Sequence, residues 1–184
     1  MIEVICSGFG GQGVLVAGMI LADAGMEDNK QVSWYPSYGF EMRGGAANCD
    51  VKISDEEIPS PFCLEPDIVY TLNETAIDTY ESRLKPGGVL LVNSSLVPDE
   101  RTYRDDIQVI KVPATTIADE LGNPKGTNIV MLGALACASD LYDEAAMRTP
   151  WSTTSARRAR STPKTPSALT AAQTRPASSC NFLV

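Results

Sequence analysis

The sequence of 184 residues contains no histidine. This absence excludes His-based acid–base catalysis, Ser-His and Cys-His nucleophile pairs and most transition-metal sites. The five cysteines are scattered, without the Cys-x-x-Cys spacing typical of zinc or iron–sulfur ligands. No run approaches the roughly 20 apolar residues that a transmembrane helix needs. We therefore expect a cytoplasmic protein with reduced, mostly buried thiols, no metal site and no membrane association.

Basic residues are also scarce. The chain has 15 Lys and Arg against 23 Asp and Glu, a formal net charge of -8. Neutralising the phosphates of a nucleic acid requires clustered Lys and Arg. The composition therefore argues against a nucleic-acid partner.

The C-terminal segment, residues 148–184, differs sharply from the rest of the chain. It contains six basic residues and no acidic one, and Ser, Thr, Pro and Ala dominate it. Such a low-complexity composition cannot offset the entropy cost of folding, which predicts an irregular, disordered tail. The alternative is a reading-frame shift that replaced a natural C-terminal helix, since one codon choice for Arg148 to Ser155 encodes a helix-compatible sequence in another frame. Either interpretation leaves residues 1–147 as the folded domain.

Within residues 1–147, short apolar runs alternate with stretches of helical periodicity. Strands are expected at 2–7, 31–35, 47–54, 67–72, 89–92 and 108–112, and helices at 14–26, 74–84, 115–121 and 128–141. Asn73 is placed to cap the second helix by accepting hydrogen bonds from its free amides. This alternation predicts one α/β domain, a Rossmann-like three-layer fold with a largely parallel sheet.

The run Gly8-Phe9-Gly10-Gly11-Gln12-Gly13 matches G-x-G-x-x-G between a predicted strand and a predicted helix. Glycine permits a tight turn and close approach of phosphates, and free N–H groups at a helix start attract anions. A turn packed for structural reasons is the alternative. The second strand ends without an acidic residue to bind an adenosine ribose, which argues against NAD. The expected cofactor-binding residues are Gly8, Gly10, Gly11, Gln12 and Gly13.

The segment from Pro36 to Cys49 is the other dense motif, and we expect it to include a glycine-containing loop at the carboxyl end of a strand, followed by the strand 47–54. Its side chains would face a ligand or subunit cleft. A solvent-exposed ion pair between Glu41 and Arg43 is the structural alternative. The candidate substrate or interface residues are Tyr38, Glu41, Arg43, Gly44, Gly45 and Asn48.

These motifs occur in the order found in a known family. The chain resembles the γ subunit of 2-oxoacid:ferredoxin oxidoreductases, also called the pyruvate/ketoisovalerate oxidoreductase catalytic domain, over about residues 1–147. The resemblance rests on Gly8 to Gly13, Pro36 to Cys49, Lys85 to Gly88, Val92 to Ser95 and Gly122 to Leu135. Phe40 departs from the family pattern, which has proline between Gly39 and Glu41.

The resemblance implies an enzyme complex that oxidatively decarboxylates a 2-oxoacid, transfers the acyl group to coenzyme A and reduces ferredoxin. It implies α and β subunits and a ferredoxin-like subunit as partners, which would carry thiamine diphosphate, Mg and iron–sulfur clusters. This chain alone would bind no cofactor, contribute no catalytic residue by itself and be inactive in isolation, while contacting coenzyme A in the complex. Its Glu-Met-Arg-Gly-Gly loop resembles 2-oxoglutarate or branched-chain types, and we favour 2-oxoglutarate.

Two other functions are consistent with the residues. One is a free-standing nucleotide-binding Rossmann domain, and the other is a non-catalytic structural scaffold of the complex. Co-purification with partner subunits would distinguish the subunit hypothesis from a free-standing domain. Altered kinetics of a complex that carries substitutions in this chain would distinguish it from a structural scaffold.

Overall fold

The computed structural model describes residues 1–39 and 44–138, which form an α/β domain around one sheet. The strands are β1 (Ile2–Phe9), β2 (Gln31–Tyr38), β3 (Ala46–Ser54), β4 (Ile68–Thr71), β5 (Val89–Asn93) and β6 (Gln108–Val112). Their order is β2-β3-β1-β4-β5-β6. The pairs β1–β4, β4–β5 and β5–β6 are parallel, whereas β3 runs antiparallel between β2 and β1. The predicted largely parallel sheet is confirmed, with β3 as its antiparallel strand.

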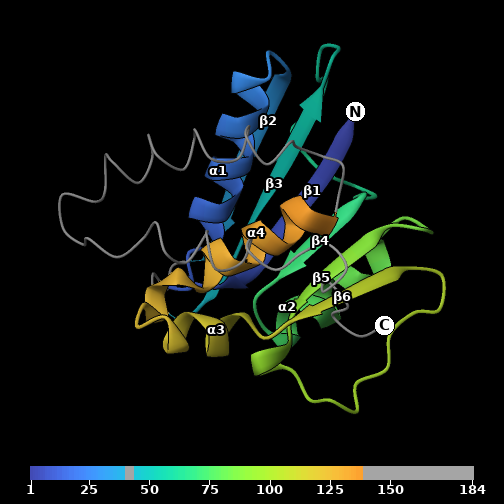
Figure 1. Cartoon of the computed structure of the whole chain (residues 1–184). Helices are drawn as coiled ribbons and strands as arrows, with labels where there is room; N and C mark the ends of the chain where they lie inside the picture. The colour runs from blue at the N-terminus through green and yellow to red at the C-terminus, as the bar shows by residue number, and fades with distance from the viewer. Residues whose placement is uncertain (40–43, 139–184) are drawn as a thin grey trace.

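Helices cover both faces of the sheet. They are α1 (Val14–Glu27), α2 (Glu74–Tyr80), α3 (Ala114–Glu120) and α4 (Thr127–Ala138), with short 3-10 turns at Glu81–Arg83, Ser94–Leu96 and Pro124–Gly126. Residues of α1 and α4 pack with the sheet in one hydrophobic core, and residues of α2 pack in a second core on the opposite face. Figure 1 shows α1 and α4 in front of the sheet and α2 behind it. The predicted three layers are confirmed.

Two local predictions need correction, and a third is confirmed. The strand β2 continues through Pro36 to Tyr38, where a loop was predicted, so the connection to β3 is shorter. Proline is tolerated there because β2 lies at the edge of the sheet. The predicted helix 74–84 is α-helical only to Tyr80 and ends in a 3-10 turn. The capping role of Asn73 is confirmed, because its Oδ1 accepts a hydrogen bond of 2.9 Å from the Ala76 N–H.

The core beneath α1 contains two cysteines directly opposite each other on neighbouring strands. Cys6 of β1 and Cys49 of β3 are register partners, and both are buried free thiols. A side-chain interaction in which the Cys6 thiol donates to Cys49, together with burial, raises the pKa of Cys6 well above its usual value. Cys63 is likewise buried and free, whereas Cys137 is exposed. The prediction of mostly buried thiols is confirmed for three of these four residues.

The opposite face of β1 and β3 carries buried charges. Lys52 Nζ lies 2.8 Å from Glu3 Oε1, and the two side chains are only 6% and 11% exposed. The neighbouring Asp50 accepts a hydrogen bond of 2.9 Å from the Cys63 N–H. Burial raises the pKa of the Asp50 carboxyl, and burial together with Asp50 raises the pKa of the Cys63 thiol to about 12. These contacts fix the segment after β3 onto the sheet.

Some predictions fall outside the described residues. These are Glu41 and Arg43, the predicted helix 128–141 beyond Ala138, and the tail 148–184. In the part of the chain that the structure describes, every helix is too short or too polar to span a membrane.

Candidate functional site

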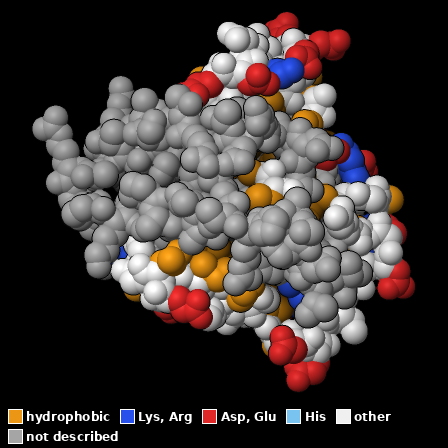
Figure 2. All heavy atoms as spheres, in the orientation of Figure 1, with side chains coloured by type: hydrophobic (Ala, Val, Ile, Leu, Met, Phe, Trp, Pro, Cys, Tyr) orange, Lys and Arg blue, Asp and Glu red, His pale blue; other side chains and the backbone are white. Residues whose placement is uncertain are grey.

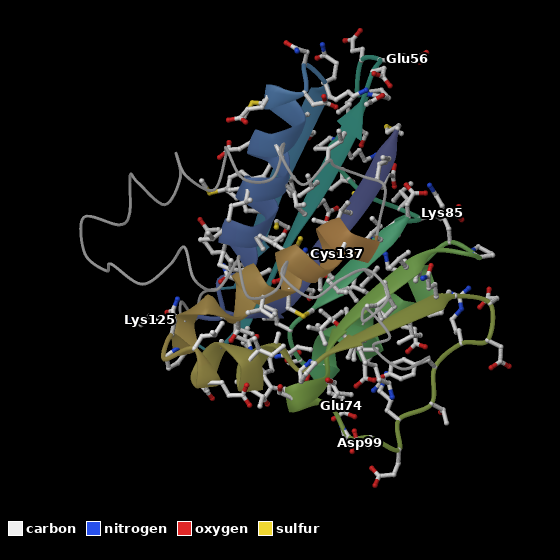
Figure 3. All side chains as sticks on the ribbon, viewed as in Figure 1. Glu56, Glu74, Lys85, Asp99, Lys125 and Cys137 are labelled. Carbon is white, nitrogen blue, oxygen red and sulfur yellow. The ribbon has the colours of Figure 1, made fainter. Side chains whose placement is uncertain are left out.

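The candidate site lies at the carboxyl ends of β1 and β4, where the chain path diverges. After β1 the chain passes through α1 to β2 at one edge of the sheet, and after β4 it passes through α2 to β5 on the other side. In open α/β sheets, ligands bind in the crevice outside such a switch point. Figure 3 shows Glu74, the first residue of α2, at this end of the molecule and Glu56 at the opposite end.

The glycine-rich loop forms a tight turn that opens α1, as predicted. The N–H of Gln12 donates to the Phe9 carbonyl at 3.1 Å, and Gly13 caps the helix in the left-handed region with φ 81°. The first helical hydrogen bond joins the Ala17 N–H to the Gly13 carbonyl at 3.0 Å. The preceding N–H groups of residues 14–16 therefore have no backbone acceptor among the described residues. Such groups can bind an anion.

The glycines of this loop have different surroundings. A Cβ at Gly8 would lie 2.7 Å from Gln12 Oε1, and a Cβ at Gly13 would lie 2.6 Å from Asn128 Nδ2. Gly8 and Gly13 therefore make room for polar side chains of the protein itself. Among the described residues other than its two chain neighbours, none has an atom within 4 Å of a Cβ placed at Gly11, where φ is 101°. No described side chain accounts for a glycine at this position.

The two motifs that the sequence singled out are in contact. The N–H of Gly10 donates to the Gly45 carbonyl at 2.9 Å, and the N–H of Gly44 donates to the Gly10 carbonyl at 3.3 Å. Tyr38, at the end of β2, is 67% exposed. Asn48 lies within β3, opposite Ser7 and Ser37, as the expected strand 47–54 implies, and not on the loop to which the site prediction assigned it. Apart from Asn48, the described residues of both predicted sets therefore lie together at the end of the sheet where β1 and β2 end and β3 begins.

Two asparagines at this edge were not predicted as site residues. Asn73 follows β4 and donates from Nδ2 to Gln12 Oε1 at 3.1 Å. Asn93 ends β5, is fully buried and donates to Thr115 Oγ1 at 2.9 Å. The signal available in the sequence was their position, since each directly follows an apolar run that forms a buried strand. Asn73 links the segment after β4 to the loop after β1, and Asn93 links the end of β5 to the first turn of α3.

Figure 2 shows acidic side chains at both the upper and the lower end of the visible face. In residues 1–39 and 44–138, no group of three or more His, Cys, Asp or Glu side chains could hold a metal ion. Among the described residues, the glycine-rich loop, Asn73 and Asn93 supply backbone N–H groups and side-chain amides at this end.

A three-layer α/β domain with a glycine-rich turn at the switch point defines a Rossmann-like domain. The family model described as pyruvate ferredoxin/flavodoxin oxidoreductase matches residues 3–166. The chain belongs to this family, within which it is a γ-type subunit of the 2-oxoacid:ferredoxin oxidoreductases.

Two curated relatives illustrate the match. The chain is 43% identical over 147 residues to the 2-oxoglutarate synthase subunit KorC of Methanocaldococcus jannaschii, covering 79% of each chain. It is 37% identical over 134 residues to the ketoisovalerate oxidoreductase subunit VorA of Methanothermobacter marburgensis, covering 73% of this chain. It spans only 28% of VorA. Relatives of both the 2-oxoglutarate and the ketoisovalerate type therefore occur.

Solved structures agree with the fold. The γ subunit of a keto/oxoacid ferredoxin oxidoreductase from Geobacter sulfurreducens has a TM-score of 0.74 and 32% identity, and the match covers 94% of this chain and 95% of that one. The 2-oxoglutarate:ferredoxin oxidoreductase from Magnetococcus marinus, solved with 2-oxoglutarate, coenzyme A and succinyl-CoA bound, has a TM-score of 0.81 over 100% of this chain and 31% of that one. At 20% identity, this second likeness shows the fold alone.

Proposed function

We propose that this γ-type subunit contacts coenzyme A in a complex that oxidatively decarboxylates 2-oxoglutarate and reduces ferredoxin. The 2-oxoglutarate assignment is supported by the 43% identity to KorC and by the Glu-Met-Arg-Gly-Gly form of residues 41–45. Branched-chain 2-oxoacids are the alternative substrates, supported by the similarity to VorA. Decarboxylation requires a group that stabilises a carbanion and an electron acceptor, and amino-acid side chains supply neither. Thiamine diphosphate, Mg and the iron–sulfur clusters would therefore belong to the α, β and ferredoxin-like partners.

The observation that carries the coenzyme A proposal is the open turn at Gly11. Apart from its chain neighbours, no described residue has an atom within 4 Å of a Cβ placed there, and the turn precedes the N–H groups at the start of α1 that lack a described backbone acceptor. Coenzyme A brings several phosphate oxygens, which such N–H groups bind well. Gly11 would let these oxygens approach the main chain.

We further propose that the segment from Tyr38 to Asn48 faces the subunit that carries thiamine diphosphate. Arg43 would clamp a carboxylate or phosphate through two parallel hydrogen bonds, which lysine cannot reproduce, and Glu41 would orient it. The hydrogen bonds between Gly10 and the residues Gly44 and Gly45 support a shared edge for the two functions. The same end of the sheet, at the carboxyl end of β1, would then contact both the partner subunit and coenzyme A.

The coenzyme A proposal is tested by Gly11→Val in the assembled enzyme. The new side chain would occupy the open approach, so we expect KM for coenzyme A to rise at least about tenfold, a loss of about 1.4 kcal/mol in binding. The matched control is Gly87→Val, because Gly87 has φ 78° and also no atom within 4 Å of a Cβ, but lies in the turn before β5 at the other end of the sheet. Equal KM values in the two variants would contradict the proposal.

The same assay examines the proposed interface with Arg43→Ala. A surface substitution should change the stability of the free chain by no more than about 0.5 kcal/mol. A rise in KM for one substrate would assign Arg43 to that substrate, whereas a uniform loss of activity that follows reduced assembly would assign it to the interface. Normal assembly and normal kinetics would contradict both roles.

A further inference from the structure

Two side-chain amides are joined across the switch point. Gln12 Oε1 accepts two hydrogen bonds, one of 2.7 Å from the Phe9 N–H and one of 3.1 Å from Asn73 Nδ2. Asn73 Oδ1 in turn accepts the hydrogen bond from the Ala76 N–H at 2.9 Å. A continuous path of hydrogen bonds therefore runs from the glycine-rich loop to the first turn of α2.

The backbone donors at the two ends of this path fix the orientation of both amides. A backbone N–H can only donate, so the oxygen of Gln12 must face Phe9 and the oxygen of Asn73 must face Ala76. The nitrogen of Asn73 is then the atom that faces Gln12. Gly8 supports the arrangement, because a Cβ there would lie 2.7 Å from Gln12 Oε1. Turning either amide over would leave a backbone N–H opposite another donor.

The nitrogen of Gln12 is left to face away from this path. The side chain is partly exposed, and among the described residues Nε2 donates to no acceptor. Gln12 is the residue just before Gly13, which caps α1. Its N–H₂ group, held in a fixed direction, offers two donors from the glycine-rich loop.

We propose that Gln12 Nε2 donates a hydrogen bond to an oxygen of bound coenzyme A, and that Asn73 is a positioning residue that holds the Gln12 amide in the required orientation. This inference rests on the proposed function of the glycine-rich loop. Asn73 does not contact the ligand. It acts by occupying Gln12 Oε1, which keeps Nε2 directed outward.

Two isosteric substitutions test the proposal in the assembled complex. Gln12→Glu keeps an oxygen to accept from Phe9 and Asn73 but removes the N–H₂ donor. Asn73→Asp keeps the cap on Ala76, since Asp caps helices as well as Asn, but removes the donor to Gln12. We expect each to raise the Kd for coenzyme A, measured by calorimetry, at least about tenfold without lowering the thermal midpoint.

The control is Glu74→Gln, which alters a neighbouring charge, 46% exposed and outside this path. Its Kd should stay unchanged. If Gly11→Val weakens coenzyme A binding but Gln12→Glu does not, the role of Gln12 is wrong and the proposed function stands. If neither variant changes Kd, both are wrong. If only Asn73→Asp weakens binding, Asn73 acts through helix α2 alone and the positioning role is wrong. If the Asn73→Asp variant unfolds, Gln12→Glu still tests the contact between Gln12 Nε2 and coenzyme A.

Discussion

Replacing Lys52 by methionine is expected to lower the free energy of unfolding by about 3 kcal/mol or more, as is typical when one partner of a buried ion pair is removed. The substitution would leave the Glu3 carboxylate, which is 11% exposed and 2.8 Å from the ammonium, without its counter-charge. Methionine matches the length of the lysine stem, so little packing is lost. Chemical denaturation of the full chain, followed by circular dichroism, measures the change.

The matched control is Lys30→Met, which removes an ion pair to Asp55 at the surface. The side chains of Lys30 and Asp55 are 32% and 81% exposed, and exposed pairs contribute no more than about 1 kcal/mol. Adding Glu3→Gln to Lys52→Met should recover part of the lost stability, since the buried charge is then gone. Equal effects of Lys52→Met and Lys30→Met would contradict the importance of burial.

A second large effect is expected at Gly13. Valine there would adopt φ 81° in the left-handed region, and its Cβ would lie 2.6 Å from Asn128 Nδ2. Left-handed backbone costs a non-glycine residue about 1–2 kcal/mol, and overpacking typically adds about 1–3 kcal/mol. The Asn128 side chain would also lose its hydrogen bond of 3.2 Å to the Gly13 carbonyl. We expect Gly13→Val to destabilise the chain by about 3 kcal/mol or more.

Gly87→Val separates the two causes. Gly87 has nearly the same φ, 78°, but nothing lies within 4 Å of a Cβ there. Gly87→Val should therefore lower the free energy of unfolding only by the cost of the left-handed backbone, about 1–2 kcal/mol. If Gly13→Val is no more destabilising than Gly87→Val, the contact with Asn128 does not restrict that position.

The sequence predicted most of the fold because its strands are short, apolar and separated by turn residues. The direction of β3 was not predictable, because residues 47–54 show the same apolar content whether the strand pairs in parallel or antiparallel fashion. The extent of β2 was underestimated because Pro36 reads as a turn residue. Only the strand order places it at an edge, where the missing N–H costs nothing.

The glycine-rich loop was predictable as part of a site because its motif lies between a strand and a helix. The different roles of its glycines were not predictable. Gly8 and Gly13 leave space for the side chains of Gln12 and Asn128, and Asn128 is far from the loop in the sequence. The contact between Gln12 and Asn73 joins residues 61 positions apart. It follows from β1 and β4 being neighbours, which periodicity alone does not reveal.

The central claim, that this chain acts as a subunit of a 2-oxoacid:ferredoxin oxidoreductase, is tested most directly by reconstitution. Coenzyme A-dependent reduction of ferredoxin by 2-oxoglutarate would be measured with the chain alone, with its partner subunits alone, and with all of them together. The account predicts no turnover by the chain alone, little by the partners alone, and full turnover only when all are combined. Turnover by the isolated chain, or an unchanged rate when it is omitted, would contradict the account.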